Sequence, residues 1–162
     1  MVIKVKVTQE MLDRAYMEAT DDIFTKGNVK TQGAHRWHDR MIGKVAEMVI
    51  SEFYGVRHIK ERESYNYDFI INGVRTEVKA GYDNYKFKLI KFTMEPDIYM
   101  YVSLSGMEYS ERDHNFKEGF ASIIGYITPM DFMRYQRPLF KNGRNYMYVP
   151  IDRLHKVIPV IV

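Results

Sequence analysis

The stretch YNYDFIINGVRTEVKAG, residues 65–81, predicts a β-hairpin and fixes which of its side chains face each other. Asn72 and Gly73 lie between two runs rich in β-branched and aromatic residues, and Asn-Gly suits a type I′ turn because both central residues need a positive φ. A two-residue turn makes Ile71 face Val74, and each step outward adds one pair. The outer pairs are Ile70 with Arg75, Phe69 with Thr76, and Asp68 with Glu77. The predicted hairpin therefore sets two carboxylates opposite each other.

Such opposed carboxylates need a physical reason, because directly opposed side chains stand about 4.5–5.5 Å apart at Cβ and like charges there are destabilising. Strand alternation puts Asp68 and Glu77 on one polar face together with Arg75 and Lys79. One interpretation is a solvated sheet face on which the two basic residues neutralise the two acids. The other is a divalent cation, since Mg²⁺ is usually held by one or two carboxylates, with water and substrate phosphate completing its shell.

Length and composition indicate one soluble globular domain. The chain has 162 residues, of which 46% are hydrophobic and 28% charged, and this is enough to bury a core of ordinary size. It contains no cysteine, which excludes disulfides and cysteine-ligated metal sites. The N-terminus lacks the apolar segment of a signal peptide, and no apolar run approaches the ~20 residues that span a bilayer. We expect a single domain over residues 1–162, in the cytoplasm and without membrane contact.

Basic residues are concentrated in three stretches although the net charge is only +3. Residues 26–44 hold five Lys/Arg and one acid, residues 84–92 three Lys and no acid, and residues 132–151 four Lys/Arg and no acid. Such stretches suit a polyanion, with solvated surface as the alternative for each alone. In residues 84–92 the lysines alternate with aromatic residues, which is typical of a nucleic-acid-tracking strand and also of a lysine-guarded edge strand. The predicted nucleic-acid contacts are Lys30, Arg36, Arg40, Lys44, Lys86, Lys88 and Lys91.

Hydrophobic spacing and capping residues predict helices first and then a mainly β centre. A first helix follows the N-cap Thr8 and ends by Gly27, and a second runs over about residues 34–54 and stops at Gly55. Beyond the hairpin we expect strands at residues 56–60, 97–104 and 121–127, a helix opened by Thr128 with Pro at its first position, and short extended pieces at the C-terminus. The fold class is therefore α/β or α+β, with helices around a mixed sheet.

Asp68, eight intervening residues and then Glu77-Val78-Lys79 form the pattern D…(D/E)-x-K, and in this pattern the chain resembles the PD-(D/E)XK nuclease superfamily. The resemblance covers roughly residues 43–133 and implies a restriction-endonuclease-like fold, a central mixed β-sheet flanked by helices. It departs from the family at Tyr67, which replaces the nominal Pro. It also departs after Lys79, where no helical period marks the family's second core helix.

The resemblance also implies a role for each residue of the pattern. Asp68 and Glu77, with the backbone carbonyl of Val78, would hold Mg²⁺, or Mn²⁺ as its substitute, at the scissile phosphate. Lys79 would orient or activate the attacking water, and Glu47 on the preceding helix would assist as an auxiliary acid. On a helical wheel Glu47 lies beyond the apolar stripe, where it reaches either a site at the rim or water. Phosphodiester hydrolysis needs these groups: a metal, a water-derived nucleophile and a cation beside the phosphorus.

The sequence therefore predicts a Mg²⁺-dependent DNA endonuclease of the restriction-like, phage-nuclease or junction-resolvase type. Cutting both strands requires two active sites, so a homodimer is expected. The alternatives are a nuclease acting on RNA, and a non-catalytic nucleic-acid-binding or assembly protein on the same fold. His35 and His38 fit a metal site, a basic helix start touching phosphate or plain surface, whereas His58 carries no visible signal.

Overall fold

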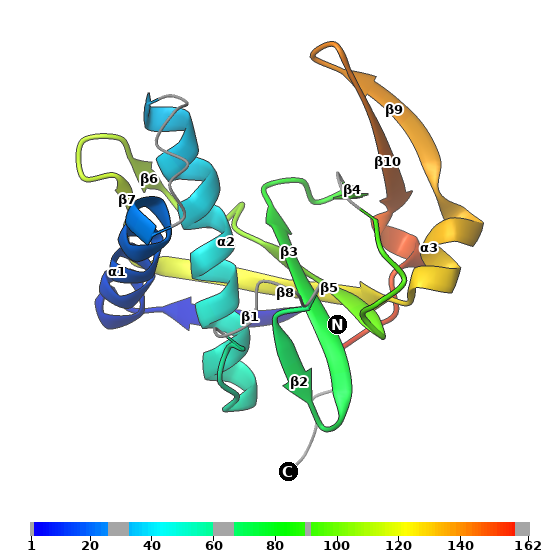
Figure 1. The fold of residues 1–162 in the computed structure, drawn as a ribbon, viewed down its shortest axis with the longest axis horizontal. Helices are drawn as coiled ribbons and strands as arrows, with labels where there is room; N and C mark the ends of the chain where they lie inside the picture. The colour runs from blue at the N-terminus through cyan, green and yellow to red at the C-terminus, as the bar shows by residue number, and fades with distance from the viewer. Residues whose placement is uncertain (1, 26–32, 60–66, 90–91, 158–162) are drawn as a thin grey trace.

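The computed structural model describes residues 2–25, 33–59, 67–89 and 92–157, without the side chains of residues 22–25 and 33–36. Figure 1 shows a central sheet with helices and a smaller sheet around it. In chain order the elements are β1 (Ile3–Val7), α1 (Gln9–Thr25), α2 (Gly33–Tyr54), β2 (Phe69–Ile71), β3 (Val74–Gly81), β4 (Lys86–Leu89), β5 (Ile98–Ser103), β6 (Tyr109–Ser110), β7 (Asn115–Phe116), β8 (Gly119–Ile127), α3 (Pro129–Tyr135), β9 (Arg137–Lys141), β10 (Arg144–Pro150) and the 3₁₀ turn η1 (Ile151–Arg153).

The central sheet has the strand order β1-β8-β5-β3-β2. Strands β3 and β5 are parallel, and the other neighbours are antiparallel, which confirms a mixed α/β fold with a mixed sheet. The expectation that helices come first is wrong, because β1 precedes them and pairs with β8 at the sheet edge. Its sequence IKVKV alternates apolar and charged residues, which is the signature of a half-buried strand.

Helices α1 and α2 pack together on one face of this sheet, and their apolar stripes form the larger core with it. The Thr8 hydroxyl accepts a hydrogen bond from the Met11 N–H at 3.4 Å, so the predicted N-cap of α1 is confirmed. Helix α2 ends at Gly55, whose φ of 64° lies in the left-handed region that favours glycine. No helix among the described residues is long and apolar enough to cross a membrane.

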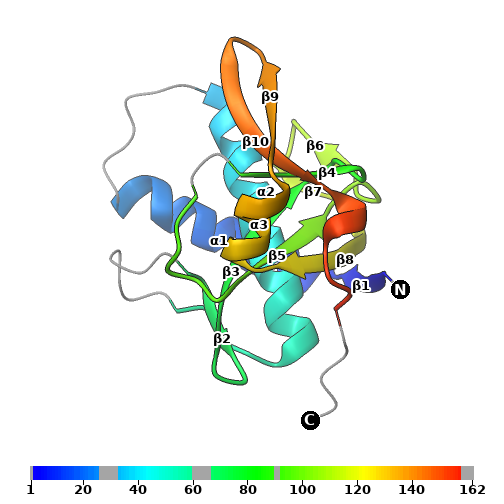
Figure 2. The same cartoon turned by 90° about the vertical axis from the view of Figure 1, so that its right-hand side faces the viewer.

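The opposite face of the sheet is covered by α3 and by a second sheet of order β4-β10-β9. Phe87, Leu89 and Val149 of this second sheet pack with Tyr99 and Tyr101 of β5 in a smaller core. Strands β9 and β10 form a hairpin that extends away from the body (Figures 1 and 2), with Asn142 and Gly143 in its turn at φ of 54° and 71°.

The predicted register of the first hairpin is confirmed for its three inner pairs, Ile71–Val74, Ile70–Arg75 and Phe69–Thr76. The paired strand ends there, so Asp68 and Glu77 are not a ladder pair as predicted. The predicted strand at residues 56–60 is also wrong. Val56–Ile59 has no strand pairing, and it is held by a hydrogen bond from the Ile59 N–H to the Asp68 carbonyl at 2.9 Å, while residue 60 lies outside the described chain.

Candidate functional site

Asp68 lies where β2 begins, at the edge of the central sheet. Its backbone N–H donates to the Thr76 carbonyl at 2.9 Å, although Thr76 is already the register partner of Phe69. Two successive residues thus meet one residue of the opposite strand, as in a β-bulge, and the side chain of Asp68 is re-aimed. Its Oδ2 accepts a hydrogen bond from the backbone N–H of Val78 at 2.8 Å. The carboxylate therefore satisfies a strand N–H beyond the end of β2, and one oxygen remains directed elsewhere.

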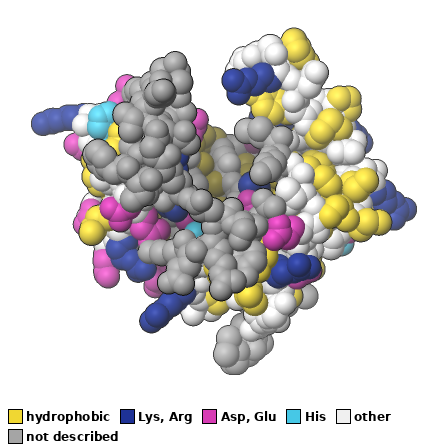
Figure 3. Space-filling model, viewed as in Figure 1, with side chains coloured by type: hydrophobic (Ala, Val, Ile, Leu, Met, Phe, Trp, Pro, Cys, Tyr) yellow, Lys and Arg dark blue, Asp and Glu magenta, His cyan; other side chains and the backbone are white. Residues whose placement is uncertain are grey.

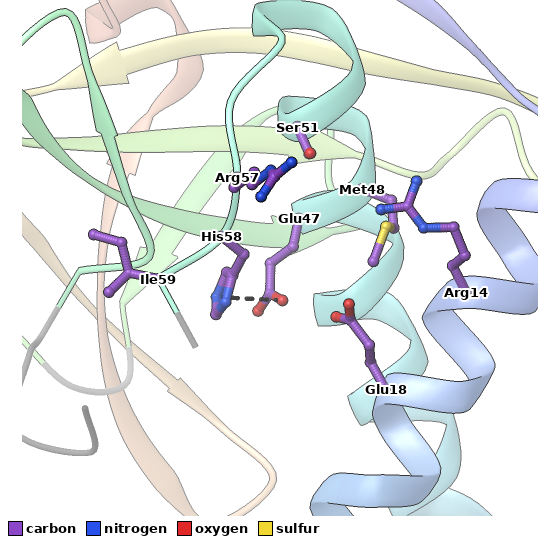
Figure 4. Close-up of a pocket in the computed structure, with 8 residues that line it drawn as sticks. All are labelled: Arg14, Glu18, Glu47, Met48, Ser51, Arg57, His58 and Ile59. Carbon is purple, nitrogen blue, oxygen red and sulfur yellow. Dashed lines mark ion pairs between the residues drawn. The ribbon is translucent and has the colours of Figure 1, made fainter. Parts of the chain in front are cut away.

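That second oxygen belongs to a group formed by Glu47, His58 and Asp68. The His58 Nε2 lies 3.4 Å from the Glu47 Oε2 and 3.4 Å from the Asp68 Oδ1. One ligand atom from each of the three residues lies within 4.8 Å of the other two. Figure 4 shows Glu47 reaching from α2 toward His58, which comes from the segment after that helix. The group thus joins three parts of the chain at one half-buried point.

Glu77 and Lys79, both on β3, form an ion pair in which the Lys79 Nζ lies 2.5 Å from the Glu77 Oε1. Their register partners on β5 are Tyr99 and Tyr101, which belong to the smaller core. Since register partners in a sheet point to the same side, Glu77 and Lys79 lie on the sheet face opposite to α2. Asp68, at the sheet edge, contacts His58 of the first group, and its charge also acts on Glu77 of this pair.

Glu47 and Glu77 are both partly dehydrated, and each lies near the charge of Asp68. Burial raises the pKa of Glu47, and the nearby charge of Lys44, 3.1 Å away, only partly opposes this. Burial also raises the pKa of Glu77, the charge of Asp68 adds to the rise, and Lys79 opposes it. A metal ion would relieve this mutual repulsion, because it favours the charged form of every carboxylate around it.

For His58, burial lowers the pKa, but the hydrogen bond to Asp68 and the charge of Glu47 outweigh it, so that the net shift is upward. The protonated imidazole would then act as a cation between two carboxylates. Its other ring nitrogen, Nδ1, is buried and has no hydrogen-bond partner within the described part of the chain. His58 thus occupies the position between the two acids that a metal ion would compete for.

A pocket of about 630 Å³ opens beside Glu47 and His58, between α1, α2 and the segment after α2 (Figure 4). Arg14 of α1 and Arg57 contribute two cations to its lining, and Glu18 contributes an acid. The pocket has room for a phosphate group next to the cluster. Guanidinium groups are suited to bind phosphate oxygens.

The solvated-face interpretation supposed that Arg75 neutralises the acids of the site, but Arg75 does not. Its side chain pairs with Asp97 at 2.8 Å, and its backbone N–H also donates to that carboxylate at 2.8 Å. Lys79, in contrast, does neutralise Glu77. The polar face of the hairpin is therefore divided between a structural pair at its turn end and the acidic group at its other end.

The predicted basic contacts are spread over several elements. Lys44 lies beside Glu47, and Arg40 is on the same helix two turns before the cluster, whereas Lys86 and Lys88 are on β4. Strand β4 is an edge strand of the second sheet, as one of the two interpretations of its lysines predicted. Arg36 is in α2, but its side chain is outside the described set. Lys30 and Lys91 lie outside the described residues altogether.

Of the two neighbouring histidines, His38 does not take part in the acidic group. Its Nε2 lies 2.6 Å from the Tyr82 hydroxyl, and its ring packs on Tyr109 with centroids 4.3 Å apart. The side chain of His35 is not described. Among the described residues, His58 is the histidine that joins the acids, and no pattern around it in the sequence indicated this. The Ile59–Asp68 hydrogen bond and the edge-to-face contact of His58 with Phe69, both between separate segments, hold it there.

Comparison of the chain with protein-family models, with curated proteins and with solved structures found no match in any of the three. The chemistry of the site therefore rests on its own residues.

Proposed function

We propose that this protein is a metal-dependent nuclease that hydrolyses phosphodiester bonds in DNA, with Mg²⁺ or Mn²⁺ as its cofactor. The observation that carries the proposal is the position of Asp68 at the sheet edge, where it contacts His58 of the Glu47–His58 pair and its charge acts on Glu77 of the Glu77–Lys79 pair. Three carboxylates and a lysine gathered at one half-buried edge, next to a pocket lined by two arginines, suit a metal and a phosphodiester.

The donor set suits such ions. Asp68 is the ligand shared by two possible arrangements, with Glu77 and the Val78 carbonyl in one and with Glu47 and His58 in the other. The first is composed of oxygen ligands, which Mg²⁺ prefers, and requires Glu77 to leave Lys79. The second contains an imidazole, which suits Mn²⁺ and later transition metals better than Mg²⁺. The choice of metal thus distinguishes the two arrangements.

In this proposal each side chain has a separate task. A metal held by Asp68 with its neighbouring ligands would supply positive charge against the charge that develops on the phosphate. Lys79, released from Glu77, holds its ammonium group beside the attacking water and the phosphorus. Glu47 accepts a proton or holds a water, because a carboxyl group with a raised pKa exchanges protons closer to neutral pH. Arg14 and Arg57 bind phosphate oxygens at the pocket.

The test is incubation of supercoiled, linear and branched DNA, and of RNA, with the protein and Mg²⁺ or Mn²⁺. Wild type is expected to nick or cut DNA, and both EDTA and the Asp68→Asn substitution are expected to abolish the activity. Asp97→Asn is the matched control, since it removes one carboxylate from the same hairpin environment but outside the group. Cleavage that survives in Asp68→Asn contradicts the proposal. Cleavage of RNA but not of DNA changes the proposed substrate from DNA to RNA.

A second candidate is a non-catalytic nucleic-acid-binding or assembly protein. One observation favours it: the acids have cationic neighbours within the protein, Lys79 for Glu77 and His58 for Glu47 and Asp68. Titration of the protein with Mn²⁺ distinguishes the two. Binding that depends on Asp68 supports the nuclease, whereas no binding up to millimolar metal supports the second candidate.

Double-strand cleavage by this single site requires a second copy, so the proposal includes a homodimer on DNA. Light scattering of the protein with and without a duplex tests this part separately. A protein that stays monomeric on DNA and only nicks one strand limits the function to single-strand cleavage.

A further inference from the structure

One face of the second sheet carries five cations at register positions that point the same way. Lys88 pairs with Tyr148, which also pairs with Arg137, and Lys86 pairs with Pro150 two residues further on. Toward the turn, Lys141 pairs with Arg144. Opposed residues and residues two apart share a side of a sheet. We call this set the basic face, and it consists of Lys86, Lys88, Arg137, Lys141 and Arg144.

The opposite side of the same sheet is apolar and explains why the basic face is turned outward. Phe87, Leu89 and Val149 are buried in the smaller core. They alternate with the basic residues, so burial of one set exposes the other. Beyond this core the β9–β10 hairpin extends free of the body (Figure 2), and Arg137, Lys141 and Arg144 are exposed there.

Lys141 and Arg144 stand directly opposite each other beside the turn, an arrangement of like charges that destabilises a hairpin. Neither residue, nor Arg137, forms an ion pair with any residue in the described part of the chain. The 20-residue stretch 132–151 contains no acid to offset them. A hairpin that keeps uncompensated, opposed cations is better explained by an anionic partner than by its own stability.

A chain of contacts links the basic face to Lys79 of the candidate metal centre. Lys79 is the register partner of Tyr101, and the Tyr101 hydroxyl donates to the carbonyl of Asp83 at 2.7 Å. The carboxylate of Asp83 in turn lies 3.4 Å from the Lys88 Nζ. In Figure 3 the surface is hollowed between the helical side of the molecule and the hairpin, and Lys or Arg side chains lie on the part of the hairpin that borders the hollow.

We propose that the β9–β10 hairpin is a clamp that binds the sugar–phosphate backbone of duplex DNA through the basic face and holds it across the hollow. This inference deepens the proposed nuclease function and rests on it for the identity of the polyanion. The basic face presents cations to a ligand but few aromatic rings on which a base could stack. The Lys86 ammonium covers the Tyr148 ring, 5.0 Å from its centroid, and Tyr146 is half-buried. Contacts are therefore to phosphates, and binding is independent of sequence.

The test is binding of a fluorescent duplex in EDTA, where no cleavage occurs, over a salt series of about 50–200 mM. The clamp variant is Arg137→Gln/Lys141→Gln/Arg144→Gln. The control variant, Lys4→Gln/Lys6→Gln/Arg112→Gln, removes three exposed cations elsewhere on the protein and so has the same net charge as the clamp variant. The clamp variant is expected to bind about tenfold or more weakly and to lower the slope of log affinity against log salt by about 2–3, at roughly 0.9 per lost phosphate contact. Equal losses in the two variants overturn the clamp.

A second measurement does not depend on the folding of a triple variant. The chain has no cysteine, so Phe140→Cys, at a side chain 72% exposed on the hairpin, accepts one fluorophore. Phe120→Cys, 54% exposed on β8, is its control. Duplex is expected to change the emission of the hairpin label and leave the control label unchanged. A response to single strands alone, or an equal response to polyglutamate, overturns the assignment to duplex DNA.

The clamp and the nuclease fail in different ways. If wild type cleaves DNA in an Asp68-dependent manner but the clamp variant keeps the full salt slope, the clamp is wrong and the nuclease stands. If the clamp variant loses binding but wild type never cleaves, the hairpin binds DNA and the nuclease is wrong.

Discussion

Asp68 has two tasks, and its two carboxylate oxygens divide them. Oδ2 accepts from the Val78 N–H and so completes the backbone hydrogen bonding of β3, while Oδ1 faces His58. Asp68 is therefore not the ladder partner of Glu77 that the hairpin register predicted, but a residue that both supports β3 and belongs to the acidic group. A substitution of Asp68 should therefore be measured for its effect on stability and for its effect on activity.

We predict that Asp68→Asn and Asp68→Ala differ in stability but not in activity. Asn keeps one oxygen for the Val78 N–H and relieves repulsion with Glu77, so its free energy of unfolding stays within about 1 kcal/mol of wild type. Ala leaves that N–H without its partner and costs about 1–3 kcal/mol. Both abolish cleavage. Urea unfolding of the metal-free proteins measures the difference, and equal stability of the two variants contradicts a structural role for Oδ2.

Lys79 is expected to act in chemistry and to contribute little to DNA binding. Lys79→Ala should lower the cleavage rate by about 100-fold or more, on the scale of a lost general acid–base group, and leave the affinity for a duplex in EDTA nearly unchanged. The measurement is single-turnover cleavage beside equilibrium binding. Lys4→Ala is the matched control, and full cleavage by Lys79→Ala removes this lysine from the mechanism.

At the scale of elements, the site exists because β2 is short and β3 is long. Beyond Thr76, β3 continues to Gly81 without β2 as a neighbour, and this exposed stretch of edge is where Asp68 can reach it. On its other side β3 pairs with β5, and Asp97, directly before β5, fixes the start of that strand to β3. That carboxylate binds both the backbone and the side chain of Arg75.

The Asp97–Arg75 pair should stabilise the protein in a pH-dependent way. The hydrogen bond from the Arg75 side chain lowers the pKa of Asp97 from 3.8 to about 2. A carboxyl group with a lowered folded-state pKa contributes stability above pH 3.8, and this is lost as the pH falls through about 2. Asp97→Asn should therefore lower the melting temperature at pH 7, and the difference from wild type should shrink between pH 4 and pH 2. A difference that is constant with pH shows that the charge of Asp97 is not involved.

At the scale of the whole molecule, the candidate metal centre joins parts that the two cores keep separate. Glu47 comes from the helical face, Asp68 from the sheet edge, and Glu77 from the face with the smaller core. An ion bound by residues of different elements acts as a cross-link in the folded state. Its effect on stability is therefore global.

We predict that Mn²⁺ raises the melting temperature of wild type. Metal at about a hundred times its dissociation constant adds roughly 2.7 kcal/mol. His58→Gln should lose much of the stabilisation by Mn²⁺ and little of that by Mg²⁺, if the imidazole is a ligand only for the softer ion. Asp68→Asn should lose both. Melting curves of the three proteins, each with EDTA, Mg²⁺ or Mn²⁺, measure this, and equal stabilisation of Asp68→Asn by either metal excludes Asp68 as a ligand.

By itself, the sequence determined the local structure around the site. The Asn72-Gly73 turn set the inner hairpin pairs, and Thr8, Gly55 and Thr128 marked helix ends, because turns and caps depend on neighbours within a few residues. The same Asn-Gly signal at Asn142-Gly143 marks the turn of the β9–β10 hairpin. The alternating sequence of Ile3–Val7 suits a strand, but its partner β8 lies far along the chain, so the pairing is a tertiary contact.

Only the tertiary structure decided where the hairpin ends and what surrounds Asp68. Pairing stops at Phe69, and the Asp68 carbonyl instead accepts a hydrogen bond from Ile59 of the segment after α2, whose His58 lies beside Glu47 and Asp68. Arg75 pairs with Asp97, 22 residues away in the sequence, and not with the acids of the site. These neighbours are set by packing of distant segments. Short-range propensity contains no information about such contacts, because their energy exists only once the core has formed.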